Sequence, residues 1–327
     1  MMIYKMKNKV EVSKTKQYGI LLKRYGTILG YVLICLVFTL ATEKFLTFSN
    51  IITILRQIVP LSVLSLGLTF VMVVKKSDLS IGYATSILGI VVGASMKDFG
   101  LTVGFAVIVT LLCGALIGLA NGLAVAYIGV PDFIATLGIG YLLSGLNQAY
   151  TKGYSLSGFP TAFDLFGIQR IGGVIPVSLV ILFLVFLILQ IIISKTKFGR
   201  YVYAIGDNAE ATMMSGINIK FNILRSYIFS GIGAGIAAVI LVSKLGQANP
   251  TAGEAYLLDA MAAVYLGATV FKDGEPNLPG TFLGALIIGT VSNGLTLMSM
   301  PYYIKDIATG IIIIVAVTVT AIQKMKK

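Results

Sequence analysis

The side chains that most often carry out chemistry are scarce in this sequence of 327 residues. It contains no histidine, which removes the usual proton shuttle and the commonest metal ligand. Its two cysteines, Cys35 and Cys113, lie within apolar runs and do not have the spacing of a metal site. No Gly-x-x-x-x-Gly-Lys-Ser/Thr sequence occurs, so the chain has no phosphate-cradling loop. We therefore expect no catalytic residue, metal site or cofactor on this chain, and we expect any ATP to be hydrolysed by another protein.

Two acidic residues and two asparagines lie inside apolar runs. Asp78 is found in KKSDLSIG and Asp259 in YLLDAMAAVYLG, each near the start of a run. A carboxylate at membrane depth is functional by default, but one at a helix start can instead accept hydrogen bonds from free backbone N–H groups. We interpret both carboxylates as helix caps. Asn121 and Asn293 can bond to another helix or line a polar pathway, and bonding between helices is the preferred interpretation.

The composition excludes an ordinary soluble protein. Hydrophobic residues make up 57% of the chain and charged residues only 12%, whereas soluble domains average about 45–50% and 25%. The alternation expected of a membrane β-barrel is absent, and 36 glycines favour close packing of helices. We therefore predict an all-α membrane protein. In such a chain the net charge of +12 reports which loops face the cytoplasm, so we expect a lipid membrane and no nucleic acid as partner.

Ten apolar runs are long enough to cross a bilayer. They cover roughly residues 27–46, 57–74, 78–96, 101–128, 131–149, 172–194, 223–243, 256–271, 278–298 and 304–322. With both termini in the cytoplasm, most of the 25 lysine and arginine residues fall on the inner side, as the positive-inside rule requires. We expect residues 1–26 to form a basic cytoplasmic segment that is not a cleaved signal peptide, 27–322 a single transmembrane domain, and 323–327 a cytoplasmic tail.

Two segments about 170 residues apart are similar to each other. Residues 114–123 read GALIGLANGL and residues 284–295 read GALIIGTVSNGL, and Pro131 and Pro301 follow them at similar distances. This offset of five spans would place the two copies in opposite directions across the membrane, as in the inverted repeats of many transporters. The alternative is that glycine-rich helices resemble each other by composition alone. A repeat of this kind favours a transport function.

The longest polar stretch between spans in the second half covers residues 194–220, and the charge pattern places it in the cytoplasm. Asp207 followed by Glu210 has the spacing of a capping box, which marks a helix start. Gly216 can adopt the left-handed conformation that ends a helix. These signals predict a short helix from about residue 208 to 215.

Met213 and Met214 would give this short helix an adaptable apolar surface. One interpretation is that the helix inserts into a groove of a cytoplasmic partner. The other is that it lies on the lipid headgroups. The spacing of the residues does not separate the two.

Five segments together resemble the transmembrane permease subunits of bacterial ABC importers for ribose and related simple sugars. They are DLSIG at 78–82, NGLAVAYIGVPDFIATLG at 121–138, TKFGRYVYAIGDNAEATMMSGI at 196–217, PTAGEAYLLDAMAAVYLGAT at 250–269 and NLPGTFLGALIIGTVSNGL at 277–295. The match covers nearly all of the chain after about residue 26. The sequence VFKDGEPNLPG at 270–280 departs from the small or glycine-rich form expected there. The resemblance therefore leaves the cargo open among pentoses, other monosaccharides, a sugar-like autoinducer and, more distantly, nucleosides.

The resemblance implies a type II importer fold of about ten helices in two inverted five-helix halves, placed in a bacterial plasma membrane. It implies three partners, namely a second permease copy or a paralogue, a cytoplasmic ABC ATPase that binds ATP and Mg, and an extracytoplasmic sugar-binding protein. Residues 194–222 would be the cytoplasmic coupling loop, whose short helix docks into a cleft of the ATPase. The matching residues in this chain are Asp207, Asn208, Glu210, Met213, Met214, Ser215 and Gly216.

Polar residues in or beside the repeat-related spans are the candidates for lining a transport pathway. They are Asn121, Thr136, Ser144, Asn147 and Asn293. The alternative function is an ion-coupled secondary transporter that works without an ATPase. Such a protein needs an ion site in broken helices near the middle of the membrane, and the scarcity of carboxylates in the runs counts against it.

Overall fold

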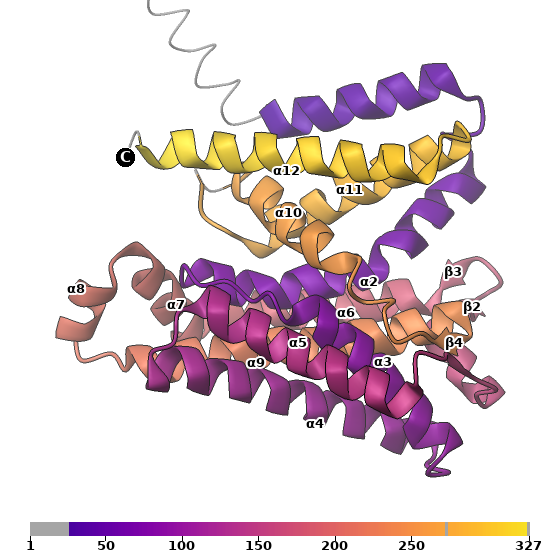
Figure 1. Cartoon of the computed structure of the whole chain (residues 1–327). Helices are drawn as coiled ribbons and strands as arrows, with labels where there is room; N and C mark the ends of the chain where they lie inside the picture. Colours follow the sequence, from indigo (N-terminus) through magenta and orange to yellow (C-terminus); the bar gives the residue numbers. More distant parts are fainter. Residues whose placement is uncertain (1–25, 272–273, 326–327) are drawn as a thin grey trace, which may run out of the picture.

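The computed structural model describes residues 26–271 and 274–325, with side chains described up to residue 318. Its long helices run roughly parallel to one another (Figure 1). A first helix is described from Gly26 to Ala41. The remaining α-helices are α2 (Phe48–Val73), α3 (Ile81–Lys97), α4 (Val103–Gly122), α5 (Asp132–Thr151), α6 (Val177–Lys195), α7 (Lys197–Asp207), α8 (Ala209–Met214), α9 (Ile219–Leu245), α10 (Tyr256–Ala268), α11 (Leu278–Leu297) and α12 (Tyr302–Met325), and a 3-10 helix covers Thr161–Phe166. A π-helix, Leu123–Ile128, continues α4.

Each of the ten predicted apolar runs coincides with a helix of the structure. Among the described residues, five helices are long and apolar enough to cross a membrane, with α4 counted together with its π-helical end. These five are α2, α4, α6, α9 and α11. The first helix, α3 and α10 are apolar but shorter. The prediction of an all-helical membrane chain is confirmed at this coarser level.

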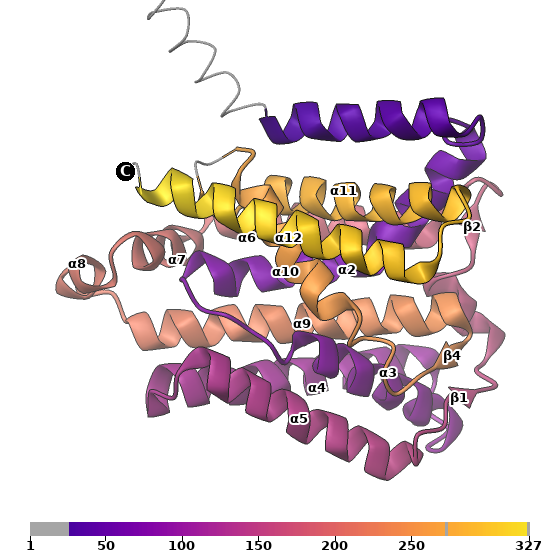
Figure 2. The same ribbon diagram turned by 45° about the horizontal axis from the view of Figure 1, so that its top comes forward.

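Two ends of the molecule can be told apart (Figures 1 and 2). At one end, which we call the α8 end, lie α7 and α8 together with the described start of the first helix and the end of α12. At the other, the hairpin end, lie the short paired strands. They are β1 (Leu156–Ser157) with β4 (Gln247–Ala248), and β2 (Arg170–Ile171) with β3 (Ile175–Pro176). The structure thus places the predicted coupling loop at the same end as both described ends of the chain.

Helices α2 and α9 form the centre of the bundle. Two thirds of the most apolar window of each is buried inside the chain, against 22% for α4 and α6. The two helices approach closely, because a Cβ on Gly67 of α2 would lie only 3.2 Å from the Cα of Gly233 of α9. Apolar burial gains little in a membrane, because lipid tails are as apolar as the side chains. Close backbone contact instead stabilises helix association through van der Waals attraction. The central pair is therefore a tightly packed unit.

Glycine spacing also fixes α4 against α9. A Cβ on Gly118 would collide with the carbonyl oxygen of Tyr227, and one on Gly114 would collide with that of Gly231. The Gly-x-x-x-Gly spacing of Gly114 and Gly118 therefore marks close helix packing, which the abundance of glycine in the sequence favours. These contacts leave no room for a side chain between the two helices.

An irregular segment, residues 74–80, leads from α2 into α3, and its inner part is buried. Backbone groups that are buried in a membrane protein must find partners inside the protein. Side chains of α5 and α9 supply them here. Asp132 Oδ2 accepts a hydrogen bond from Ser77 N at 2.6 Å, Thr136 Oγ1 accepts one from Leu79 N at 3.0 Å, and Tyr227 donates to the Ser77 carbonyl at 2.8 Å.

Asp78 lies within this segment, and its cap interpretation is confirmed in part. Its Oδ1 accepts hydrogen bonds from both the backbone N–H and the hydroxyl of Ser80, at 3.0 and 2.6 Å. The residue that caps α3 is Ser80, however, and Asp78 Oδ2 accepts a bond from Ser230 of α9 at 2.7 Å. The side chain is 3% exposed. Asp78 therefore joins α3 to α9 as well as stabilising the helix start.

Candidate functional site

The predicted short helix is present as α8, but its start differs from the prediction. Asp207 is the last residue of α7 and does not cap α8. Asn208 has the extended backbone of a cap, with φ −152° and ψ 104°, and its Oδ1 accepts a hydrogen bond from Ala211 N at 3.0 Å. The capping box between Asp207 and Glu210 is therefore wrong by one residue, because α7 stays helical through Asp207. An asparagine caps a helix as well as an aspartate does.

The end of α8 follows the prediction. Gly216 has φ +76°, in the left-handed region that favours glycine. Its N–H bonds to the Met213 carbonyl at 2.9 Å, and the N–H of Ile217 bonds to the Thr212 carbonyl at 3.4 Å. These two bonds form a Schellman motif, which satisfies carbonyls at the helix end. Gly216 is thus confirmed as the residue that ends α8.

The surface of α8 is exposed nearly all round. Met214 is 88% exposed and Met213 is 61% exposed, while Glu210 and Ser215 are exposed as well. Thr212 is the one buried residue of α8. Figure 1 shows α8 projecting beyond the helical bundle at the α8 end. A six-residue helix with two exposed methionines has the shape and the adaptable apolar surface needed to enter a groove of another protein.

Helix α7 supports α8, and the sequence patterns do not predict it. Its Phe198, Val202 and Ile205 are buried against the bundle, at the spacing of one helix face. Thr196 caps α7 by accepting a hydrogen bond from Gly199 N at 3.3 Å. A Cβ on Gly206 would collide with the carbonyl of Val73 at the end of α2. Because α7 packs directly on α2, α8 is held on a rigid support.

Two of the predicted pathway residues lie at the contact between α3, α4 and α5. Asn121 is 1% exposed and donates to Ser80 Oγ at 2.7 Å. Thr136 is fully buried and accepts a hydrogen bond from the Leu79 backbone. In this conformation both side chains bond to the segment before α3 and do not face an open space. Their role in a pathway stays a prediction.

The other three candidates lie toward the hairpin end. Asn147 is 1% exposed and donates to the Pro250 carbonyl at 2.7 Å. Asn293 is 4% exposed, and its Oδ1 accepts a hydrogen bond from Asn50 of α2 at 3.0 Å. Ser144 is half-buried on α5. The structure does not bring the five candidates together into one cluster.

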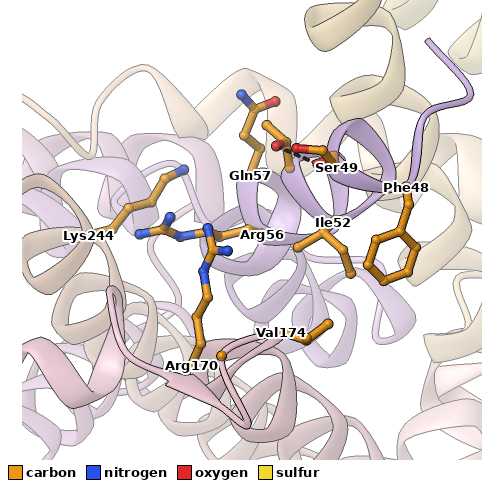
Figure 3. A pocket seen from close by; sticks show the side chains of 10 residues that line it. Phe48, Ser49, Ile52, Arg56, Gln57, Arg170, Val174 and Lys244 are labelled. Carbon is orange, nitrogen blue, oxygen red and sulfur yellow. Dashed lines mark hydrogen bonds between the residues drawn. The ribbon is translucent and has the colours of Figure 1, made fainter. Parts of the chain in front are cut away.

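A hollow of about 450 Å³ at the hairpin end gathers three basic side chains (Figure 3). They come from three elements: Arg56 from α2, Arg170 from β2, and Lys244 from the end of α9. Arg56 donates from Nε and Nη2 to the Gly167 carbonyl, at 3.2 and 2.9 Å. The residues that line the hollow include no aspartate or glutamate, and none of the three cations has an ion pair with another described residue. Like charges that converge in this way favour an anion between them.

A second hollow of about 290 Å³ adjoins the first, because Gln57 and Lys244 line both. It is bounded by α2, α10, α11 and the start of α12, and Asp259 lies on its wall. The cap interpretation of Asp259 is wrong. The first N–H groups of α10 already bond to the preceding turn, Tyr256 N to the Gly253 carbonyl and Leu257 N to that of Glu254, so no side chain is needed there.

Known proteins resemble this chain over most of its length. The family model described as branched-chain amino acid transport system / permease component matches residues 50–317. The ribose import permease protein of Haemophilus influenzae is 37% identical over 306 residues, which cover 92% of this chain and 94% of that protein. The D-allose transport system permease protein of Escherichia coli is 32% identical, with 96% of each chain covered. The autoinducer 2 import system permease protein of Yersinia enterocolitica is 32% identical, with 86% of each covered.

No solved structure matches the chain. The matched residues run from the first turn of α2 into α12, so they include α8, its support α7 and most of the residues that line the two hollows. The relatives are similar over nearly their whole lengths. The chain therefore belongs to the family of branched-chain amino acid transport system / permease components.

Proposed function

We propose that the chain is the transmembrane permease subunit of an ATP-driven ABC importer that carries a monosaccharide, ribose or a related simple sugar, across the plasma membrane. The relatives support this class of cargo, because their names describe transport of ribose, D-allose and autoinducer 2. The exposed and rigidly supported α8 carries the proposal, since a transporter that needs no ATPase needs no such docking element. ATP and Mg would be bound by the partner ATPase.

In this proposal the α8 end faces the cytoplasm, with both termini, and the hairpin end faces outward. The positive-inside rule supports the orientation. The proposal of ten spans in two inverted halves is supported by two similar pairs of helices, α2 with α3 and α9 with α10. In each, a long buried helix (α2 or α9) is followed by a non-helical segment and a short apolar helix (α3 or α10). Helix α2 begins at the hairpin end and α9 begins at the α8 end, so the two helix pairs run in opposite directions (Figure 2).

A second permease copy or paralogue and an extracytoplasmic sugar-binding protein complete the importer. The basic hollow formed by Arg56, Arg170 and Lys244 is the contact we assign to the binding protein. Ribose and allose carry no ionised group, so an anion for this hollow comes from acidic side chains of a docked protein. Complementary charges of this kind speed association and fix orientation.

The test is purification of the tagged chain from its native membrane, with identification of the proteins that accompany it. We expect an ABC ATPase to co-purify with the wild-type chain and to be lost with Met214→Asp, which changes an exposed side chain of α8. Met300→Asp, a change at the hairpin end, is the matched control and should retain the ATPase. If the chain instead purifies alone and carries sugar into liposomes without ATP, the ion-coupled transporter replaces this proposal.

A further inference from the structure

The second hollow has an unusual set of polar side chains. Asp259, Gln57 and Ser292 line it, together with Lys244 and Lys305. In the described part of the chain, none of these five side chains takes part in a hydrogen bond. The one contact between them is an ion pair of 3.8 Å from Lys305 Nζ to Asp259 Oδ2, which is longer than a hydrogen bond.

The carboxylate of Asp259 is not simply a solvated surface group. The side chain of Asp259 is only 13% exposed, and it lies where α10 packs against α2 and α12. A carboxylate that is mostly removed from water and has no donor leaves its hydrogen-bonding capacity unused, which costs free energy until a ligand supplies donors. The remaining exposure of Asp259 is toward the hollow that it lines.

The arrangement of donors and acceptors indicates the chemistry of the ligand. Asp259 accepts hydrogen bonds, the two lysines donate them, and Gln57 and Ser292 do both. Hydroxyl groups, which both donate and accept hydrogen bonds, can satisfy all five side chains at once. An anion would face the Asp259 carboxylate, and a cation would face the two ammonium groups. The hollow therefore fits a neutral compound with several hydroxyl groups.

The rest of the wall fits the same kind of ligand. Ile58, Leu61 and Ile288 give the hollow an apolar floor, and Tyr256 adds an aromatic ring. Gly289 lies opposite Ile58 so closely that a Cβ there would collide with the isoleucine side chain. A volume of about 290 Å³ lies at the lower end of small-molecule sites, so it admits one sugar ring and no larger cargo.

We propose that this hollow is a sugar subsite of the permease itself, which holds one neutral monosaccharide at the hairpin end through Asp259, Gln57 and Ser292. The inference rests on the proposed function and adds a step to it. Sugar released at the basic hollow enters the adjoining subsite, because the two share Gln57 and Lys244. Charge-assisted bonds to Asp259 are the strongest contacts of the subsite.

The experiment uses the full chain in lipid nanodiscs and D-ribose and D-allose as probes, with binding followed by saturation-transfer NMR. We expect transfer to at least one of the sugars. Asp259→Asn should weaken the affinity tenfold or more, because the substitution keeps the shape but removes the charged acceptor. Gln57→Leu is a second variant that alters an exposed side chain without internal bonds, and it should weaken binding as well. The control is Asp98→Asn, an exposed carboxylate at the hairpin end, which should bind as the wild type does.

Two results would overturn the subsite. One is a wild-type chain that shows no transfer to either sugar, and the other is an Asp259→Asn chain that binds as tightly as the wild type. Stimulation of the partner ATPase by the binding protein, measured on the same samples, separates this inference from the proposed function. A chain that stimulates the ATPase but binds no sugar loses the subsite only, whereas a chain that fails to stimulate it loses the importer function.

Discussion

Replacement of Gly216 by valine tests whether the shape of α8 couples the chain to an ATPase. Gly216 has φ +76° and open space around the position of a Cβ, so the substitution acts through the backbone alone. An L-residue in the left-handed region costs about 1–2 kcal/mol, and a β-branched one costs at least as much. Because a six-residue helix has almost no stability of its own, this cost falls on the last turn of α8.

At 25 °C that free energy shifts the equilibrium between intact and frayed α8 by roughly 5- to 30-fold. We expect Gly216→Val to reduce both sugar uptake and stimulated ATP hydrolysis by a similar factor in proteoliposomes that contain the purified ATPase and binding protein. The melting temperature of the chain should hardly change, since Thr212 is the one buried residue of α8. Gly216→Asn should retain most of the activity, because asparagine tolerates this conformation best among the larger residues.

Gly100 provides the matched control. It has φ +61° and equally open surroundings, but it lies in the turn between α3 and α4 at the hairpin end. Gly100→Val should therefore introduce the same backbone strain without loss of coupling. The reasoning is refuted if Gly216→Val couples as the wild type does, or if Gly100→Val and Gly216→Val lose activity equally.

Three further predictions concern packing, the buried carboxylate and the outer partner. Gly118→Ala should destabilise the chain by about 1–3 kcal/mol in thermal unfolding, because its Cβ meets the backbone of α9, whereas Gly138→Ala on α5 has open space and should be neutral; equal effects would contradict the packing. Asp78→Ala should destabilise it by at least about 3 kcal/mol, since three hydrogen bonds are lost, and a loss below about 1 kcal/mol would contradict this. Arg170→Glu should slow association of the binding protein about tenfold at low salt and less at high salt, while Lys152→Glu, outside the hollow, should have little effect in the same kinetic measurement.

The sequence predicts the apolar helices well because each coincides with a long, predominantly apolar run. Even the short helices α3 and α10 are found, since Asp78 and Asp259 lie at or near the starts of their runs. Helix α7 is missed for a physical reason. It has eleven residues and an amphipathic pattern, and in a polar loop such a pattern is weaker than a transmembrane signal. The buried spacing of Phe198, Val202 and Ile205, after the cap at Thr196, was the signal that could have found it.

The sequence predicts those features of the candidate site that depend on local backbone chemistry. It does not predict the features that depend on contacts between distant segments. Gly216 ends α8 because the helix end needs a left-handed backbone, which glycine adopts most easily. The residue type alone therefore predicts this position. The role of Asp259 depends on the turn before α10, whose carbonyls satisfy the helix start, and on Lys305, which is 46 positions further along the chain. Asn121 and Asn293 are polar residues in apolar helices, and only the packing decides that they face Ser80 and Asn50. Sequence patterns give the helix face but not the neighbour it meets.

The two functional ends of the molecule are connected by the central helices. Gln57 of α2 lines the sugar subsite, and Val73, at the other end of the same helix, contacts α7 beneath α8. At 1.5 Å per residue these positions lie about 24 Å apart. Helix α9 runs in the opposite direction, from beside α8 to Lys244, which lines both hollows.

The two central helices meet at Gly67 and Gly233 with no side chain between them, so they cannot slide past one another without breaking close backbone contact. A displacement of α8 by a bound ATPase would therefore reach the hollows through movement of the pair as a body. Pro60 lacks a backbone N–H, so α2 loses one helical hydrogen bond about one turn from Gln57, which lines the second hollow. Under the proposed function, a bound ATPase would therefore act at the α8 end, and α2 would bend near the wall of the second hollow.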